Sequence, residues 1–412
     1  MTDRTATGQR VLVTAAASRI GGLIVAALES DPAIETIIAV DAEAPPAPFQ
    51  RAEFVRLRDH YAQLARVAAG AAIDVVVDVR AAAALAPLDH AALVDLSDGS
   101  DRILDLCGDP EGGVRRLVVL SSTHRYGWDS DLPRFVTEQT PLASREGGSP
   151  LLRALAELES RAQAVAAGRD ELGLAVLRTA DPVGPAGAGL LQALDLLPLF
   201  PTVLGFDPPV QVVHEDDLAR AAAHVVVAGL DGEYLVAADG TLALTEALRA
   251  LGVTHAPVLP PWGTGLLSRL LHRTGLRFTQ DIAGLLRHGR GIDNRKLKAT
   301  GFAYRSTTRE ALATVVPGRR RRLALSAGSV PADNAYDADV EAFLRYSPSA
   351  QRPEVPAADE QRHGIAALDA DALLALLPSL DADALRALRA HEQAGPRRVR
   401  LIAEIDLVLA ER

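Results

Sequence analysis

The sequence is poor in the residue types on which several classes of protein depend. Its 412 residues include one cysteine, Cys107, so the chain has no internal disulfide framework, which is typical of a reducing compartment. The formal net charge of −10 gives the chain as a whole no electrostatic attraction for nucleic acid. No apolar run approaches the roughly 18 to 20 residues of a membrane span, and the N-terminus lacks the apolar segment of a secretory signal. We therefore expect a cytoplasmic protein without a membrane span or a nucleic-acid partner.

Apolar runs typical of buried strands alternate with helical patterns in the first part of the chain. The strand-like runs are residues 11–13, 36–40, 75–77, 117–120 and 174–177, and the helical segments are residues 22–28, 61–68, 91–106 and 151–167. Strands that alternate with helices pair in parallel, because each helix returns the chain to the same edge of the sheet. The pattern predicts an α/β fold with a doubly wound, Rossmann-like parallel sheet over residues 9–182.

The rest of the chain divides into parts of different composition. Residues 183–316 mix short strand and helix patterns and predict a smaller region on the substrate side, which completes a domain of residues 1–316. Residues 317–362 are rich in proline, alanine and charge, as linkers are. Residues 363–412 predict a helical module. Its three short amphipathic helices are expected at residues 369–377, 381–394 and 397–410.

The first strand leads into a turn that has one glycine where a phosphate-binding turn has three. In the segment VLVTAAASRIGG, Ala15 and Ser18 occupy the first two glycine positions and Gly21 the third. Glycine matters there because a missing Cβ lets the backbone approach a pyrophosphate. Ser18 and Arg19 still offer donors to a phosphate. The second strand, TIIAVD, ends at Asp41, where a carboxylate can accept the hydroxyls of a ribose.

The order of these and later segments resembles the extended short-chain dehydrogenase/reductases, which include NAD-dependent sugar-nucleotide epimerases and dehydratases. The turn lies over the family pattern T-G-x-x-G-x-x-G, and VVLSSTHRYG over S-S-x-x-x-Y-G. VLRTADPVGP is similar to L-R-x-x-x-V-x-G-P, VVHEDDLARA to H-V-x-D-x-A, and RHGRGIDNRKLKATGF to the segment before the last helix. The resemblance covers residues 9–315 and implies a domain that binds NAD.

The resemblance also implies which residues form the sites. Ser122 stands at the place of the active-site hydroxyl, and Tyr126 follows in the same segment, so these two are the candidate catalytic residues. NAD is expected rather than NADP, because the carboxylate of Asp41 repels a 2′-phosphate. The candidate cofactor-binding residues are Thr14, Ala15, Ser18, Arg19, Ile20, Gly21, Asp41 and Arg80.

The catalytic pair of the family is missing from the sequence. Family chemistry uses a tyrosine four residues before a lysine, so that the ammonium lowers the phenol pKa and the phenolate acts as general base. Lysine occurs only at positions 296 and 298, and the helix that would carry the pair has Leu151 and Leu155 in its place. We expect a protein that binds a dinucleotide but lacks ordinary family turnover, a possible pseudoenzyme.

Two other functions remain open on the sequence alone. One is a non-catalytic binding or regulatory protein that uses its C-terminal helices to contact a partner or a second copy. The other is a hydrolase or transferase with Ser122 as nucleophile, but the chain has no G-x-S-x-G elbow, and His124 lies too near in sequence to serve as its base without other support. We expect no metal site at residues 214–217, because adjacent side chains point in different directions, and assign Asp216 or Asp217 as a helix cap.

Overall fold

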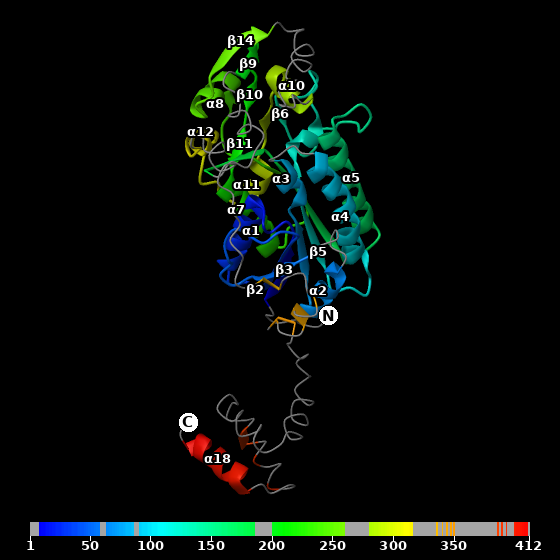
Figure 1. The fold of residues 1–412 in the computed structure, drawn as a ribbon, viewed down its shortest axis with the longest axis vertical. Helices are drawn as coiled ribbons and strands as arrows, with labels where there is room; N and C mark the ends of the chain where they lie inside the picture. Colours follow the sequence, from blue (N-terminus) through cyan, green and yellow to red (C-terminus); the bar gives the residue numbers. More distant parts are fainter. Residues whose placement is uncertain are drawn as a thin grey trace. The chain divides into compact units, whose positions relative to one another are not determined.

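The chain forms two compact units in a computed structural model, Met1–Ala350 and Gln351–Arg412 (Figure 1). Most of the first unit is described, whereas the second is described mainly at its last helix. The described residues are 8–57, 63–85, 90–185, 200–259, 280–315, 335–336, 340, 343–344, 347, 349–350, 385–386, 389, 393 and 399–410.

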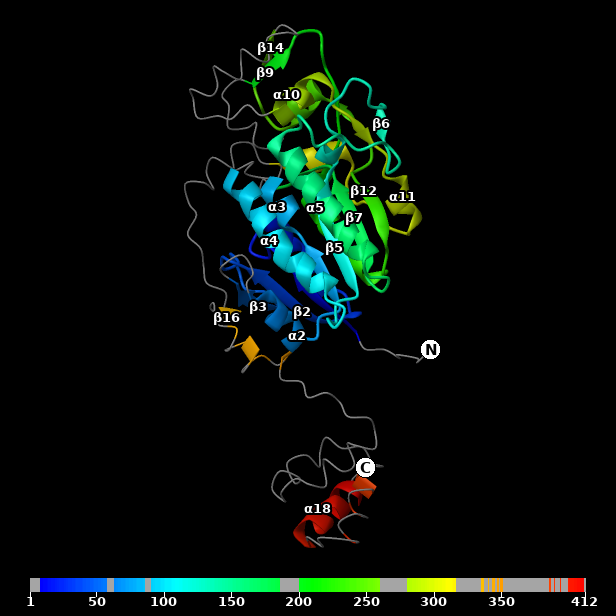
Figure 2. The ribbon, with the colours of Figure 1, turned by 90° about the vertical axis from the view of Figure 1, so that its right-hand side faces the viewer.

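A parallel sheet runs through the first unit (Figures 1 and 2) and confirms the expected doubly wound fold. Its described strands lie in the order β12-β7-β5-β4-β1-β2-β3-β16, and every neighbouring pair is parallel. The strands are β1 (Gln9–Val13), β2 (Ile34–Asp41), β3 (Glu53–Arg56), β4 (Val75–Asp78), β5 (Arg116–Ser122), β7 (Gly173–Thr179), β12 (Gly232–Val236) and β16 (Ala335–Tyr336). The direction of winding reverses between β1 and β4. Open parallel sheets bind ligands beyond the carboxyl ends of their strands at such a reversal.

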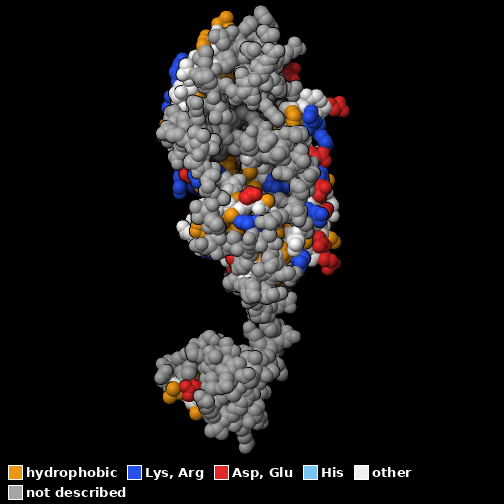
Figure 3. Space-filling model, in the orientation of Figure 1, with side chains coloured by type: hydrophobic (Ala, Val, Ile, Leu, Met, Phe, Trp, Pro, Cys, Tyr) orange, Lys and Arg blue, Asp and Glu red, His pale blue; other side chains and the backbone are white. Residues whose placement is uncertain are grey.

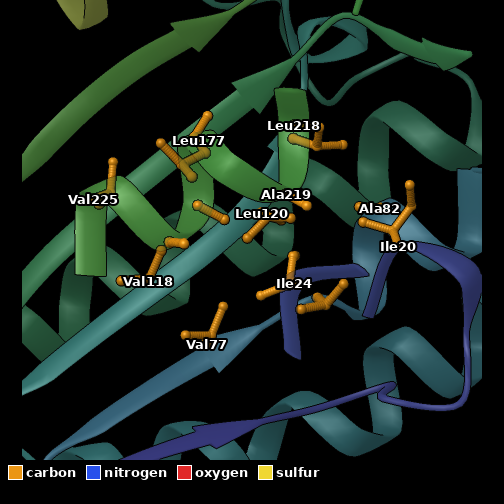
Figure 4. Packing of buried hydrophobic residues seen from close by; sticks show 14 of the residues in the cluster. Ile20, Ile24, Val77, Ala82, Val118, Leu120, Leu177, Leu218, Ala219 and Val225 are labelled. Carbon is orange, nitrogen blue, oxygen red and sulfur yellow. The ribbon is translucent and has the colours of Figure 1, made fainter. Parts of the chain in front are cut away.

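Helices cover both faces of this sheet, so its central strands carry apolar side chains on both faces. Val11 and Val13 face one core with the helices α1 (Arg19–Glu29) and α7 (Glu215–Val227), part of which is shown in Figure 4. Leu12 faces the opposite core. That second core is covered by α2 (Leu64–Gly70), α4 (His90–Gly108) and α5 (Pro150–Ala167). Each fully buried aliphatic side chain stabilises the fold by about 1.5 to 3 kcal/mol.

Most segments after β7, apart from α7, β12 and β16, form with β6 a smaller mixed region that has an apolar core of its own. Its strands pair as β8 (Asp181–Val183) with β11 (Val212–His214), β9 (Phe200–Val203) with β14 (His255–Leu259), β10 (Pro209–Val210) with β13 (Leu242–Ala243), and β6 (Phe135–Val136) with β15 (Gly291–Ile292). Its helices are α8 (Leu244–Ala250), α10 (Gln280–Arg287), α11 (Arg295–Ala299) and α12 (Thr308–Ala313). Val183, Phe200 and Leu286 are among the buried residues that hold these pieces together.

The expected linker of residues 317–362 needs a correction, because part of it belongs to the first unit. β16 pairs with β3 and closes that edge of the sheet. Val340 and Phe343 are buried in the core beneath α2, and the hydroxyl of Ser347 donates to Glu53 of β3. The prediction failed because two apolar side chains in a segment rich in proline, alanine and charge are too few to register as an element.

The second unit contains α18 (Val399–Ala410), which corresponds to the helix expected at residues 397–410. Ile405 is buried, Leu407 is 55% exposed, and Arg389 pairs with Asp406. The helix expected at residues 369–377 lies outside the described residues, as does most of the one expected at 381–394.

Charged side chains of both signs are interspersed on the side of the first unit where α5 lies (Figure 3). Arg161 of α5 pairs there with Asp101 of α4. Across the described parts of both units, no helix combines the length and the apolar character needed to cross a membrane.

Candidate functional site

The turn between β1 and α1 keeps a glycine-turn backbone although two of its positions carry side chains. Ala15 has a φ of 49°, in the left-handed region that glycine favours, which costs a residue with a Cβ on the order of 1 kcal/mol. A Cβ on Gly21 would lie 2.1 Å from the carbonyl oxygen of Ala15. The turn therefore tolerates alanine at its first glycine position and requires glycine at its third.

Ser18 caps α1 from within this turn. Its Oγ accepts a hydrogen bond from the N–H of Gly21 at 3.0 Å and donates to the carbonyl of Ala15 at 2.6 Å. The hydroxyl expected to meet a phosphate is thus used inside the turn. The backbone N–H groups of Arg19 and Ile20 have no hydrogen-bond partner in the described part of the chain. Two donors at the N-terminus of α1 are therefore available to an anion.

Asp41 lies beside the turn at the end of β2, where backbone groups fix its carboxylate. Oδ2 accepts the N–H of Ala17 at 2.9 Å, and Oδ1 accepts those of Ala42 at 2.7 Å and Glu43 at 3.3 Å. Burial raises the pKa of Asp41, and the three backbone hydrogen bonds oppose that rise. A carboxylate oxygen accepts two hydrogen bonds, so Oδ2 retains capacity for a hydroxyl donor.

Thr14 and Arg80 meet at a buried carboxylate rather than at the turn. Thr14 Oγ1 donates to Asp78 Oδ1 at 3.0 Å and accepts the N–H of Val79 at 3.1 Å. The Arg80 guanidinium binds both oxygens of Asp78, at 2.9 and 2.7 Å, and reaches Ser100 Oγ at 3.2 Å. Burial acts to raise the pKa of Asp78, but the charge and hydrogen bonds of Arg80 outweigh it and lower that pKa. Arg80, expected as a cofactor contact, is turned inward in this ion pair.

A buried glutamate near the turn was missed by sequence reasoning. Arg19 Nε and Nη2 donate to Glu215 Oε1 at 3.1 and 2.5 Å, which joins the first residues of α1 and α7. In the sequence, its only signal is a charged residue at the start of an apolar helix. His214, not an aspartate, caps α7, because its Nδ1 accepts the N–H of Asp216. Asp217 instead accepts the backbone N–H groups of Arg305 and Ser306.

Across the described chain, no group of three or more potential ligands is placed to hold a metal.

Ser122 ends β5, and its hydroxyl contacts the imidazole of His124. Its Oγ lies 2.9 Å from His124 Nδ1 and 3.4 Å from the carbonyl oxygen of Thr179. The 3-10 helix η1 (Thr123–Tyr126) folds His124 back onto Ser122, so a separation of two residues does not prevent the contact.

The ring of His124 is neutral and incompletely bonded. Burial lowers its pKa to about 4, with Asp281 acting to raise the pKa and Arg290 to lower it. Its Nε2 is buried and has no hydrogen-bond partner among the residues that the structure describes. The Trp128 ring lies edge-on to it, at a centroid distance of 5.5 Å.

Tyr126 belongs to a buried network of charges. Its hydroxyl donates to the carbonyl of Thr137 at 3.0 Å and accepts from Arg178 Nη1 at 3.3 Å. Arg178 is in turn bound to Glu159 of α5, with Nη2 2.9 Å from Oε2. Burial raises the pKa of Tyr126 and the charge of Arg178 opposes that rise. The phenol is therefore held in its protonated form.

The two leucines at the positions of the family pair lie in the second apolar core. Leu151 and Leu155 of α5 are both buried there. Ser149 caps the helix by accepting the N–H of Leu152, and its hydroxyl donates to Asp281. This end of α5 thus offers no titratable side chain at either position.

The parallel sheet, the turn at its reversal point and the acidic end of β2 define a Rossmann-type α/β protein. The sequence profile of the NAD dependent epimerase/dehydratase family matches residues 11–193. The uncharacterized protein Rv0501 of Mycobacterium tuberculosis is 32% identical over 319 residues, which are 75% of this chain and 84% of that protein. The chain belongs to the NAD-dependent epimerase/dehydratase family.

Solved structures share the fold of the first unit at low sequence identity. UDP-glucose 4-epimerase from Bifidobacterium longum, in complex with NAD+ and UDP, has a TM-score of 0.57 and 18% identity, covering 74% of this chain and 96% of its own. The Bordetella bronchiseptica enzyme WbmH, in complex with NAD+, has a TM-score of 0.56 and 15% identity, covering 76% of this chain and 98% of its own.

Proposed function

We propose that this protein binds NAD at the turn between β1 and α1 and lacks the ordinary turnover of an epimerase or dehydratase. The observation that carries the proposal is the carboxylate of Asp41, held by three backbone N–H groups at the edge of the turn. Such a carboxylate accepts ribose hydroxyls and repels the additional phosphate of NADP. Similar structures that contain NAD support the choice of cofactor.

The residues around the turn fit the diphosphate of a dinucleotide. The N–H groups of Arg19 and Ile20 lie at the positive end of the α1 dipole, which favours an anion. Gly21 lets the helix approach the turn closely enough to direct them outward. Bound NAD supplies a hydride acceptor in its nicotinamide ring. The residues of this chain bind the cofactor and orient it at the turn.

Proton transfer is the step that this chain is poorly equipped to perform. A positioned acid or base contributes on the order of 10² to 10⁴ in rate, and Leu151 and Leu155 supply neither. We assign any residual proton transfer to Ser122, which has a neutral imidazole 2.9 Å from its hydroxyl. Tyr126 remains a second candidate. Burial raises the pKa of its phenol and makes it a weaker acid, although the charge and the hydrogen bond of Arg178 oppose that rise.

Calorimetric titration of the purified full chain with NAD, NADH, NADP and NADPH tests the proposal. NAD is expected to bind more tightly than NADP, and Asp41→Ala to weaken NAD binding by about 1 to 3 kcal/mol through the loss of charge-assisted hydrogen bonds. Because burial raises the pKa of Asp41, NAD affinity should fall on acidification at a higher pH than for an ordinary aspartate.

Asp109→Ala is the matched control for this titration, because Asp109 also accepts a backbone N–H but lies at an exposed turn after α4. It should leave NAD affinity unchanged. Equal affinity for NAD and NADP, or an Asp41→Ala variant that binds NAD like the original protein, would contradict the proposal.

We also propose that the C-terminal unit contacts a partner protein or a second copy of this chain. The observation in favour is Leu407 of α18, which is 55% exposed on a helix whose Ile405 is buried. Light scattering coupled to gel filtration should report a mass above that of one chain if the partner is a second copy. Leu407→Glu should then lower that mass. If the original protein and the variant both have the mass of one chain, a second copy is excluded as the partner.

A further inference from the structure

The smaller mixed region contains a pocket beside β6, β10 and α10, in the upper part of Figure 1. Its volume is about 530 Å³, which lies in the range of pockets that hold small molecules. The lining comes from residues 129–134, 207–209, 241–243 and 287–290, so four segments far apart in the sequence meet there. None of the residues expected to bind NAD or to transfer protons belongs to it. A ligand bound in this pocket would occupy a site separate from the turn.

The walls of the pocket are fixed by the backbone. Gly289 has a φ of 52°, in the left-handed region, and a Cβ there would lie 2.3 Å from the carbonyl oxygen of Pro209. The N–H of Arg290 donates to that oxygen at 2.9 Å, and the N–H of Gly291 donates to the carbonyl of Arg134 at 3.0 Å. These contacts hold the connection from α10 to β15 against β10 and β6. Walls that are ordered in advance bind a ligand without the cost of ordering them.

Three polar side chains of the lining have no hydrogen-bond partner among the described residues. They are the guanidinium of Arg134, the hydroxyl of Thr241 and the imidazole of His288, each on a different segment. Arg134 is exposed, and Thr241 and His288 are half-buried, so a ligand in the pocket can reach all three. Together they offer hydrogen bonds to a charged group and to hydroxyl groups.

The charges of the lining favour a ligand with a single negative charge. Three arginines and two aspartates line the pocket, which leaves one positive charge in excess when His288 is neutral. Both carboxylates are bonded within the chain. Asp129 accepts the N–H of Asp131 at 3.2 Å, and Asp207 accepts the N–H and the hydroxyl of Thr245 at 2.9 and 2.7 Å. A ligand carboxylate balances the excess charge, whereas a phosphate dianion exceeds it and is repelled more strongly by the two aspartates.

We propose that this pocket binds a small carboxylic acid that carries hydroxyl groups. The guanidinium of Arg134 donates to the ligand carboxylate, and the hydroxyl of Thr241 and the imidazole of His288 bind its hydroxyl groups. A guanidinium suits a carboxylate because its N–H donors form a planar fork that matches the two oxygens. The site does not depend on NAD and gives the protein a second class of ligand.

Three six-carbon probes separate the contributions of the carboxylate and of the hydroxyl groups in calorimetric titrations of the full chain. Gluconate has both kinds of group, sorbitol has hydroxyl groups alone, and hexanoate has the carboxylate alone. Gluconate should bind at least about 10-fold more tightly than either of the others, because each of them lacks hydrogen bonds that the pocket offers. Gluconate that binds no more tightly than sorbitol or hexanoate would overturn the proposal.

Two substitutions test the assigned contacts. Arg134→Gln should weaken gluconate binding about 10-fold and leave sorbitol binding unchanged, because only the contact with the carboxylate is lost. Thr241→Val should weaken gluconate binding about 3- to 10-fold and leave hexanoate binding unchanged. Neither side chain has a hydrogen-bond partner in the described part of the chain, so both variants should match the original protein in urea unfolding.

Arg309→Gln is the matched control, because Arg309 is an exposed arginine of the same region, on α12, and lies outside the lining. It should leave the affinity for all three probes unchanged. An Arg134→Gln variant that binds gluconate like the original protein would contradict the proposal, and so would a Thr241→Val variant that does. The affinity for NAD should be the same in every variant, so this proposal and the NAD proposal can fail independently.

Discussion

The turn at β1 and the start of α5 correspond to two patterns of the family, the glycine turn and the catalytic pair, and they depart from those patterns in opposite ways. At the turn, Ala15 and Ser18 replace glycines, but the backbone conformation and the polar groups around Asp41 are kept. At α5, Leu151 and Leu155 are packed into an apolar core. The groups that hold a ligand depend mainly on backbone geometry, which tolerates substitution. Proton transfer depends on particular side chains, a tyrosine and a lysine, and this chain has leucines at both positions.

The largest expected effect is on the rate of reaction with common sugar nucleotides. Without a tyrosine and lysine pair, turnover should fall short of a family enzyme by about 10² to 10⁴, the usual contribution of a positioned acid or base. Conversion of UDP-glucose with NAD, followed by chromatography, measures it. Ser122→Ala should abolish what remains. Robust conversion that survives Tyr126→Phe would show that other residues carry out the proton transfer. The turn at β1 and the start of α5 would then not differ in the way described above.

The next largest effect is on stability at the turn. Gly21→Ala brings a Cβ to 2.1 Å from the backbone oxygen of Ala15, which cannot move away without breaking the cap of α1, so we expect a loss of about 3 kcal/mol. Gly22→Ala is the control, because its Cβ meets its nearest neighbour at 3.6 Å. Urea unfolding measures both. Equal stability of the two variants would mean that the turn is not held in this conformation.

The smallest effect is a pH dependence of stability that comes from His124. Its pKa is about 4 in the folded chain because of burial, and near 6.5 when unfolded. Between these values the unfolded chain binds a proton that the folded chain does not, so stability is complete above pH 6.5 and falls as the pH drops toward 4. Replacement by glutamine should reduce this fall by on the order of 2 kcal/mol. Parallel unfolding curves for both proteins at pH 5 and pH 7 measure it, and an unchanged difference argues against a neutral buried ring.

Much of the sheet was predictable because its central strands are buried on both sides and so appear as continuous apolar runs. Residues 11–13 and 117–120 are examples. β3 and β16 escaped because they are short and lie toward one edge of the sheet, where few apolar residues are needed. The position of Gly21 followed from its spacing in the turn, and that of Asp41 from its place at the end of the second strand. The contacts of His124 and Glu215 did not, because they depend on a 3-10 helix and on the packing of two helices distant in sequence.

The pairing of β16 with β3 decides where the chain can be shortened. A cut at residue 316, where the composition changes, removes β16 and leaves the backbone N–H and C=O groups of β3 unpaired along an open edge. An open edge is a template for pairing with other chains. The same cut takes Phe343 out of the core beneath α2 and exposes the apolar surface that it covers. A chain that ends after Ala350 keeps both, so the two lengths should differ sharply in their tendency to aggregate although no residue of the turn has been touched.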